Sequence, residues 1–234
     1  MALPRLNDTP KYDLVIPSTK QKVRFRPYLV KEEKVLMLAM ESKDPKQIIN
    51  AVVDTILACV YDDIQRKSLK TFDVEYMFLQ IRAKSVGETS KFNLKCKSCE
   101  ANNEVSVDLQ SIQIDAPEVN NIIQLTDEVS IKMQYPNYEV LGKIDFENMS
   151  DTDQSFYIIT KCIHSIMLED EVLLASDHSD TELAEFIEGL STSQFLKVRD
   201  YLETMPKLQH DVKAKCLSCG EDNEYRLEGI QDFF

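Results

Sequence analysis

Long apolar runs are missing from this 234-residue sequence. No stretch approaches the ~20 apolar residues that a membrane span requires. Residues 1–14, MALPRLNDTPKYDL, have no apolar central run and do not resemble a secretory signal. We therefore expect a protein of the reducing cell interior, where paired cysteines more often bind metal than form disulfides.

Basic side chains are scarce relative to acidic ones. The chain has 27 Lys and Arg against 40 Asp and Glu, which gives a formal net charge of -13 at pH 7. Such a balance keeps a protein soluble. It argues against binding to a nucleic-acid backbone, because that contact relies on clustered Lys and Arg.

Glycine and histidine are also scarce, with five and three residues. The Walker A, Rossmann and G-x-S-x-G patterns, which need glycines at fixed spacing, do not occur. His164, His178 and His210 lack metal-ligand spacing. Gly/Ser-rich linkers are absent too, which favours one connected body. The sequence therefore predicts a protein that is not an enzyme.

The sequence contains two copies of one ten-residue motif. Residues 95–104 read KCKSCEANNE and residues 215–224 read KCLSCGEDNE; we call them the first and second knuckle. The Lys, both Cys, the Ser between them and the closing Asn-Glu are identical. Two residues between cysteines let a tight turn aim both sulfurs at one point, and a tetrahedral zinc needs two such turns.

We therefore predict one structural Zn²⁺ per chain, held by Cys96, Cys99, Cys216 and Cys219 in a closed site. Residues of strand character flank each knuckle, which is the layout of a zinc ribbon. The spacer of 116 residues is long, but the entropy of loop closure grows only logarithmically with length. The positive charges that could moderate four thiolates are Lys95, Lys97 and Lys215.

Two other interpretations of the knuckles stay open. A thioredoxin-type redox pair precedes a helix, whereas Glu100 to Asn103 has the composition of a polar turn. Unpaired surface cysteines are the simpler alternative, and two near-identical copies argue against it. Cys59 and Cys162 lie in predicted helices and are assigned to the core, where free cysteines are common.

Periodicity predicts an α+β fold: an N-terminal β-hairpin plus helices, a zinc-ribbon-like β lobe built from the two CxxC knuckles, and a helical insertion between them. We expect these to form one compact body. The predicted segments are the hairpin and helical lobe at 1–90, the first zinc knuckle and strands at 91–135, the helical insertion at 136–206, and the second zinc knuckle and C-terminal tail at 207–234.

Within these segments, the local patterns are explicit. Strands alternate around Val23 and again at residues 129–135, and capping boxes begin at Ser150 and Ser179. We expect the helix after Ser150 to carry Phe156, Ile159, Ile163 and Ile166 on one face. The helices expected before the first knuckle cover residues 31–41, 46–60 and 73–84.

Three segments also resemble one protein family. Residues 15–42, VIPSTKQKVRFRPYLVKEEKVLMLAMES, combine a Pro-Ser-Thr turn, an Arg-Pro-aromatic-Leu-Val-Lys-Glu-Glu-Lys segment and a helix ending in Glu-Ser. Residues 129–136 read VSIKMQYP, and residues 205–234 contain MPKL, the C-x2-C-G knuckle and L-x-G-I-x-D-F-F. In order and number, these landmarks are similar to those of the baseplate hub assembly proteins of T-even-type tailed bacteriophages.

The resemblance implies a non-enzymatic protein-binding factor or minor subunit in assembly of the baseplate hub of a contractile phage tail. Its partners would be other phage baseplate hub or tail proteins, met in the host cell cytoplasm or retained in the virion tail baseplate. Membranes are not expected among its partners. On this view the candidate partner-binding residues are Arg24, Arg26, Tyr28, Phe233 and Phe234, whereas neighbouring Phe25 is expected in the core.

Two alternatives of other classes remain at this stage. A zinc-ribbon nucleic-acid-binding or transcription regulatory protein would need a basic face near the knuckles. Lysines at 91, 95, 97, 213 and 215 offer one, and acidic residues at 100, 104, 221, 222 and 224 largely cancel it. An unrecognised enzyme or redox protein would need an open metal position or a reactive thiol.

Overall fold

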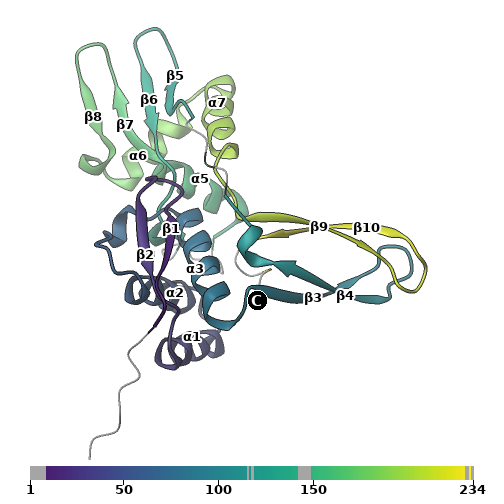
Figure 1. Ribbon diagram of the computed structural model, residues 1–234. Helices are drawn as coiled ribbons and strands as arrows, with labels where there is room; N and C mark the ends of the chain where they lie inside the picture. The colour runs from purple at the N-terminus through teal and green to yellow at the C-terminus, as the bar shows by residue number, and fades with distance from the viewer. Residues whose placement is uncertain (1–8, 115, 117–118, 142–148, 230–231, 233–234) are drawn as a thin grey trace, which may run out of the picture. The chain divides into compact units, whose positions relative to one another are not determined.

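The computed structural model describes residues 9–114, 116, 119–141, 149–229 and 232, and the chain divides into two compact units (Figure 1). Unit 1 comprises residues 1–115 and 207–234, and unit 2 comprises residues 116–206. Helices and small antiparallel sheets are mixed in both, as the α+β prediction requires. The four predicted segments and their union in one body stay predictions.

Unit 1 begins with the predicted hairpin of β1 (Tyr12–Val15) and β2 (Lys22–Phe25). The alternation in β2 buries Val23 and Phe25, so the assignment of Phe25 to the core is confirmed. The turn between the two strands is hydrogen-bonded to α3 (Thr71–Val86), 55 residues further along the chain. The backbone N–H and hydroxyl of Ser18 donate to the Asp73 carboxylate at 2.8 and 2.5 Å.

Three helices follow: α1 (Val30–Ser42), α2 (Pro45–Cys59) and α3 (Thr71–Val86). Asp44 caps α2 by accepting from the Lys46 N–H, with Pro45 in the first turn, where its missing N–H costs nothing. Cys59 is buried at the end of α2, as predicted. Short 3-10 helices occur at η1 (Arg66–Ser68), η2 (Leu109–Ser111) and, in unit 2, η3 (Ala175–Asp177).

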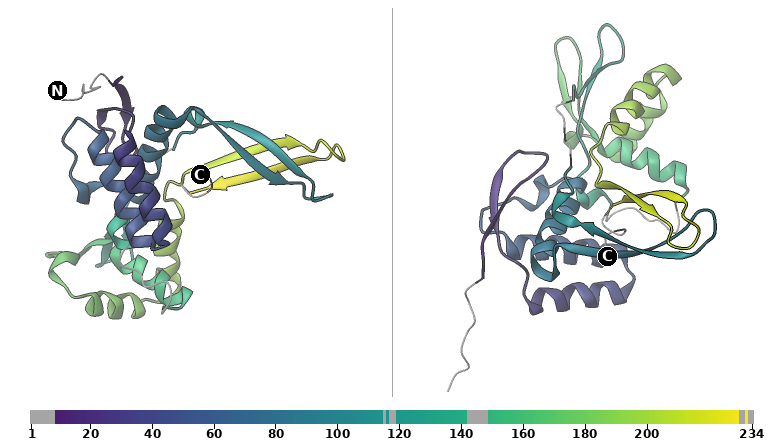
Figure 2. Two further views of the ribbon diagram at one scale, coloured as in Figure 1. Left: turned by 90° about the horizontal axis from the view of Figure 1, so that it is seen from below. Right: turned by 45° about the vertical axis from the view of Figure 1, so that its right-hand side comes forward.

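Two long hairpins complete unit 1, and they lie side by side (Figure 2). One pairs β3 (Thr89–Lys95) with β4 (Asn102–Asp108), and the other pairs β9 (Gln209–Lys215) with β10 (Asp222–Glu228). Their inward side chains form one apolar core with α3. Its buried members are Leu79, Ala83, Val107, Leu109, Ile112, Leu208, Val212 and Leu227. Because its apolar side chains are buried in this core, the C-terminal hairpin belongs to unit 1, although unit 2 lies between the two hairpins in the sequence.

Unit 2 contains a four-stranded antiparallel sheet in the order β5-β6-β7-β8. Its strands are β5 (Ile122–Gln124), β6 (Ser130–Met133), β7 (Ile163–Met167) and β8 (Val172–Leu174). Its helices are α4 (Tyr138–Leu141), α5 (Asp151–Lys161), α6 (Asp180–Glu188) and α7 (Thr192–Glu203). Residues of the sheet, α5, α6 and α7 share one core, which includes Cys162 as predicted.

The helix predicted after Ser150 is too long. The predicted helical insertion at 136–206 is therefore not purely helical, because it also contains strands β7 and β8. Helix α5 ends at Lys161, and Cys162 caps it by donating its N–H to Ile158 and Ile159. Ile163 and Ile166 lie in strand β7, where Ile166 faces Ile131 of β6. Spacing of three and four residues continues the helical period, but pairing with β6 overrides it, as tertiary context can for β-branched residues.

No helix among the described residues is both long and apolar enough to cross a membrane.

Candidate metal centre

The four knuckle cysteines converge, although 116 residues separate the two pairs. Their sulfur atoms all lie within 4.8 Å of one another. Two sulfur–sulfur contacts between the knuckles join Cys96 to Cys219 at 3.7 Å and Cys99 to Cys216 at 3.6 Å. All four are free thiols; Cys96 and Cys216 are buried, and Cys99 and Cys219 are exposed.

Each knuckle is the tip of a hairpin, and the two tips have the same backbone turn. In the first, the Cys96 N–H donates to Ala101 O at 2.9 Å and the Glu100 N–H donates to Cys96 O at 3.0 Å. In the second, Gly220 occupies the place of Glu100 and donates to Cys216 O at 2.9 Å. Both residues have positive φ, 57° at Glu100 and 78° at Gly220. The turn therefore needs the left-handed conformation, which glycine adopts without strain.

Backbone amides favour the thiolate form of the first cysteine in each knuckle. The N–H groups of Cys219 and Ser218 lower the pKa of Cys216 to about 6. Those of Cys99 and Ser98 lower the pKa of Cys96, and the Ser98 nitrogen lies 3.4 Å from the Cys96 sulfur. N–H donors stabilise a thiolate because it is the charged form that accepts them.

The second cysteines behave in the opposite way. The amide of Glu221 lowers the pKa of Cys219, but the sulfurs of Cys99, Cys216 and Cys96 together raise it to about 12. The pKa of Cys99 is raised too, against the lowering effect of the Ala101 amide. The second cysteine of each knuckle therefore holds its proton in the absence of a cation, because adjacent negative charges disfavour each other. A bound cation would displace those protons.

The hairpins also exchange side-chain contacts through two asparagines. Asn103, on the first hairpin, accepts from the Leu217 N–H of the second knuckle at 2.9 Å through its amide oxygen. Its amide nitrogen donates to Ala101 O at 2.9 Å and lies 3.6 Å from the Cys216 sulfur. Asn103 is buried, so these contacts replace its hydration.

Asn223 makes the same set of contacts in reverse. Its amide oxygen accepts from the Lys97 N–H of the first knuckle at 2.9 Å. Its nitrogen donates to Glu221 O at 3.0 Å and lies 3.5 Å from the Cys96 sulfur. Sequence comparison of the two knuckles found both asparagines identical but gave them no role. Their identity at matching positions was the available signal, because a turn rich in Asn does not by itself predict a buried side chain.

The lysines near the knuckles are largely engaged with acidic or carbonyl oxygens. Lys91 pairs with Glu104 at 2.8 Å, and Lys213 pairs with Glu224 at 3.3 Å. The Lys97 ammonium donates to Glu224 O at 2.5 Å. These pairs lie across the hairpins and offset the basic face that a nucleic-acid-binding ribbon would require. A role of Lys95, Lys97 and Lys215 in moderating thiolate charge stays a prediction.

The cysteine cluster fits a tetrahedral metal. A Zn–S distance of about 2.3 Å places neighbouring sulfurs about 3.8 Å apart in a tetrahedron. The contacts between the knuckles, at 3.6 and 3.7 Å, match that edge. Four sulfur ligands with ordered N–H donors around them are typical of closed structural sites. Cys96, Cys99, Cys216 and Cys219 would hold the ion, which would supply a cross-link between the two hairpins.

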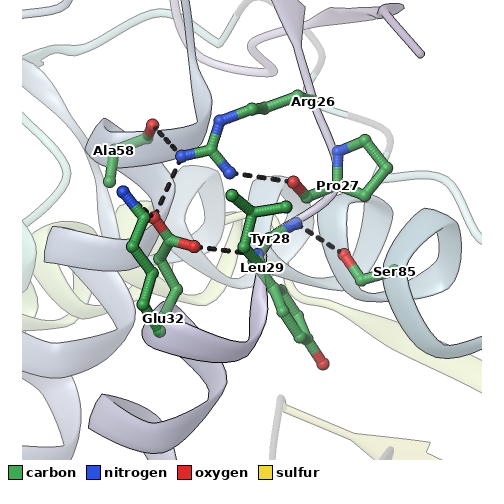
Figure 3. A network of polar contacts seen from close by, with 8 residues as sticks. Arg26, Pro27, Tyr28, Leu29, Glu32, Ala58 and Ser85 are labelled. Carbon is green, nitrogen blue, oxygen red and sulfur yellow. Dashed lines mark hydrogen bonds and ion pairs between the residues drawn. The ribbon is translucent and has the colours of Figure 1, made fainter. Parts of the chain in front are cut away.

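Three of the candidate partner-binding residues, Arg24, Arg26 and Tyr28, lie in or next to β2, and Figure 3 shows Arg26 and Tyr28. Arg26 donates to Pro27 O at 3.0 Å, to Ala58 O at 2.9 Å and to the Glu32 carboxylate at 3.0 Å. Figure 3 shows this guanidinium turned into the network, and its side chain is 14% exposed. Arg26 therefore holds β2 against α1 and α2, which accounts for it without a partner.

Arg24 and Tyr28 do not take part in the side-chain hydrogen bonds of Arg26. Arg24 is exposed, and its backbone N–H donates to Asp62 at 2.6 Å. The Tyr28 N–H donates to the Ser85 hydroxyl at 2.9 Å, and its ring is half-buried, which raises the pKa of its phenol. Phe233 and Phe234 lie outside the described residues. Partner binding by these residues stays a prediction.

Comparison with known proteins found relatives over nearly the whole chain. A family model described as T4 bacteriophage base plate protein matches residues 9–234. The baseplate hub assembly protein gp26 of Enterobacteria phage T4 is 23% identical over 224 residues, which are 96% of this chain and 97% of that protein. No solved structure matches.

Proposed function

The chain belongs to the family of T4 bacteriophage base plate proteins, and from this we propose that it acts in assembly of the baseplate hub of a contractile phage tail. The observation that carries the proposal is the end-to-end match to a baseplate hub assembly protein, with 96% of one chain and 97% of the other covered. A match of that extent concerns the whole architecture, including both knuckles, and not one shared module.

We propose that the protein works by binding other phage baseplate proteins, as an assembly factor or minor subunit, and not by catalysis. Assembly takes place in the host cell cytoplasm, and the finished site of action is the tail baseplate. Support comes from the chemistry of the clustered cysteines: the ligand set is closed and has no position for a substrate.

We further propose one structural Zn²⁺ per chain at Cys96, Cys99, Cys216 and Cys219. Sulfur is the ligand that zinc shares with few other biological cations, and the four sulfurs are already gathered. The ion would tie β3–β4 to β9–β10, so its binding free energy would appear as stability of unit 1.

The assembly role is tested in the phage that encodes the chain. An amber mutation in its gene should leave infected cells of a non-suppressing host without complete baseplates in electron micrographs. Supplying the wild-type chain from a plasmid should restore infectious particles. Normal tails and an unchanged phage yield without the chain would refute the role.

The zinc proposal is tested by metal analysis of the purified protein. We expect one zinc per chain, lost together with stability in the Cys216→Ser, Cys219→Ser variant. The matched control is Cys162→Ala, which removes a buried thiol from unit 2 and should leave the zinc content unchanged. Absence of zinc in the native protein, with four reactive knuckle thiols, would overturn the proposal.

A further inference from the structure

Helix α1 carries an unusual concentration of exposed apolar side chains. Six of the fifteen large apolar residues that are exposed on the described part of the chain lie between residues 29 and 40. They are Leu29, Val30, Val35, Met37, Leu38 and Met40. Clusters of this kind on a soluble protein mark interaction sites more often than scattered ones do.

The exposed residues form a face opposite the buried stripe of the helix. Glu32, Leu36 and Ala39 are buried against unit 1, at spacings of four and three. The outward face has the same spacing, offset by half a turn. We call it the α1 face; it consists of Val30, Lys34, Met37, Leu38 and Glu41. At its centre Met37 is 58% and Leu38 56% exposed.

The sequence of this helix is self-complementary when it is paired with itself in the antiparallel direction. With the midpoint between Met37 and Leu38, the charged and apolar residues of the α1 face between 34 and 41 meet complementary residues of a second copy. The facing pairs on the α1 face are Lys34 with Glu41 and Met37 with Leu38.

We propose that the α1 face docks against the α1 face of a second copy of this chain, with the two helices antiparallel about a two-fold axis at Met37 and Leu38. An isologous interface requires a surface that complements itself, and the pairing of Lys34 with Glu41 occurs twice in such a dimer. The two central residues form its apolar core, and methionine packs adaptably there. This inference does not rest on the baseplate role.

A single pair of helices makes a small interface, so we expect a dissociation constant on the order of micromolar or weaker. Sedimentation velocity of the full chain over two orders of magnitude in concentration should show monomer converting to dimer. Leu38→Glu should abolish the dimer. Because Leu38 is exposed, the circular dichroism and melting temperature of this variant should remain those of the wild type.

Charge reversal tests the register of the two helices. Lys34→Glu sets a carboxylate against Glu41 of the second copy and should weaken dimerisation roughly tenfold or more. The double variant Lys34→Glu, Glu41→Lys should restore it. The matched control is Lys67→Glu, an equal charge change on an exposed residue of η1, which should leave the dimer unchanged.

A chain that stays monomeric at every concentration would overturn the proposal, and the α1 face would then serve a different protein. A double variant that remains as weak as Lys34→Glu would overturn it as well, because the opposed charges would not be those of a second copy.

Discussion

Asn103 belongs to the first hairpin, yet its side chain shapes the second knuckle, where its oxygen accepts from the Leu217 N–H at 2.9 Å. Asn223 does the same for Lys97 of the first knuckle, also at 2.9 Å. Neither knuckle is therefore complete without the opposite hairpin. Since each asparagine also lies beside a cysteine sulfur, the exchange couples docking of the hairpins to placement of the metal ligands.

Asn103→Ala should weaken the metal site although it leaves all four cysteine ligands unchanged. The Leu217 N–H loses its partner, at a cost of about 1–3 kcal/mol in the free energy of unfolding. Loss of such a supporting contact also weakens metal affinity by about 10–100-fold. Competition with a chromophoric chelator measures this change.

Asn102→Ala is the matched control, because Asn102 is the exposed neighbour on the same strand. Its zinc affinity should equal that of the wild type. If Asn103→Ala also retained wild-type affinity, the exchanged contacts would have no bearing on the metal.

The two asparagines should act as one unit. Once Asn103→Ala has loosened the docking of the hairpins, Asn223→Ala has less left to disrupt. The double variant should therefore lose less stability than the sum of the single variants, by about 0.5 kcal/mol or more. A double-mutant cycle from urea unfolding measures this difference, and strict additivity would mean that the two contacts are independent.

Local patterns explain which parts of the structure were predictable. The β1–β2 hairpin follows from period-2 alternation, helix α1 from its content of strong helix formers, and helices α2 and α3 from a period of 3.6, all of which neighbouring residues decide. The duplicated cysteine spacing predicted that Cys96 and Cys219 would meet, because one tetrahedral ion needs both pairs. Membership of the baseplate family was likewise predicted, from quoted segments spread along the chain.

Contacts between distant segments explain the rest. Ile163 and Ile166 have a spacing that suits either a helix or a strand, and only the presence of β6 decides between them. Asn103 and Asn223 look like ordinary turn residues until the partner hairpin is in place. Nothing in the short strand β5 distinguishes it from a loop before it pairs with β6.

Glu100→Gly should stabilise the first knuckle. Glu100 has φ 57°, a left-handed conformation that costs a non-glycine residue about 1–2 kcal/mol. Glycine removes that strain but loses about 0.5–1 kcal/mol more conformational freedom on folding. The net gain in the free energy of unfolding should be about 0.5 kcal/mol, measured by urea unfolding of the metal-loaded protein.

Glu100→Ala separates strain from side-chain effects, because alanine removes the carboxylate and keeps the Cβ. It should give no gain. The reverse experiment is Gly220→Ala in the second knuckle, where an added Cβ meets only the Lys215 side chain at 4.0 Å. Since space is available, the loss of about 1 kcal/mol expected there reports backbone strain alone. A stable Gly220→Ala variant would contradict the shared turn geometry.

Arg26→Met should make stability depend on pH in a new way. Burial raises the pKa of Glu32, but hydrogen bonds from Arg26, Leu29 and Lys31 lower it below its ordinary value. In the wild type, Glu32 therefore contributes stability above its unfolded pKa of about 4.3, and the contribution is lost as pH falls through its folded pKa.

Without the guanidinium, the effect of burial prevails, and the pKa of Glu32 should rise above its unfolded value. The variant then carries a buried charge at neutral pH and loses about 2–3 kcal/mol, less than a fully buried pair because Arg26 is 14% exposed. The deficit should shrink between about pH 7 and pH 4.5, as Glu32 takes up its proton in the variant first. Urea unfolding at several pH values measures it.

Lys31→Met is the control, since this ammonium lies 3.2 Å from the same Glu32 carboxylate but is 71% exposed. An exposed charge contributes only about 0–1 kcal/mol, so Lys31→Met should change stability little at any pH. A deficit of Arg26→Met that stays constant as the pH falls would instead mean that Arg26 acts through its contacts with Pro27 and Ala58, because neither carbonyl takes up a proton in this range.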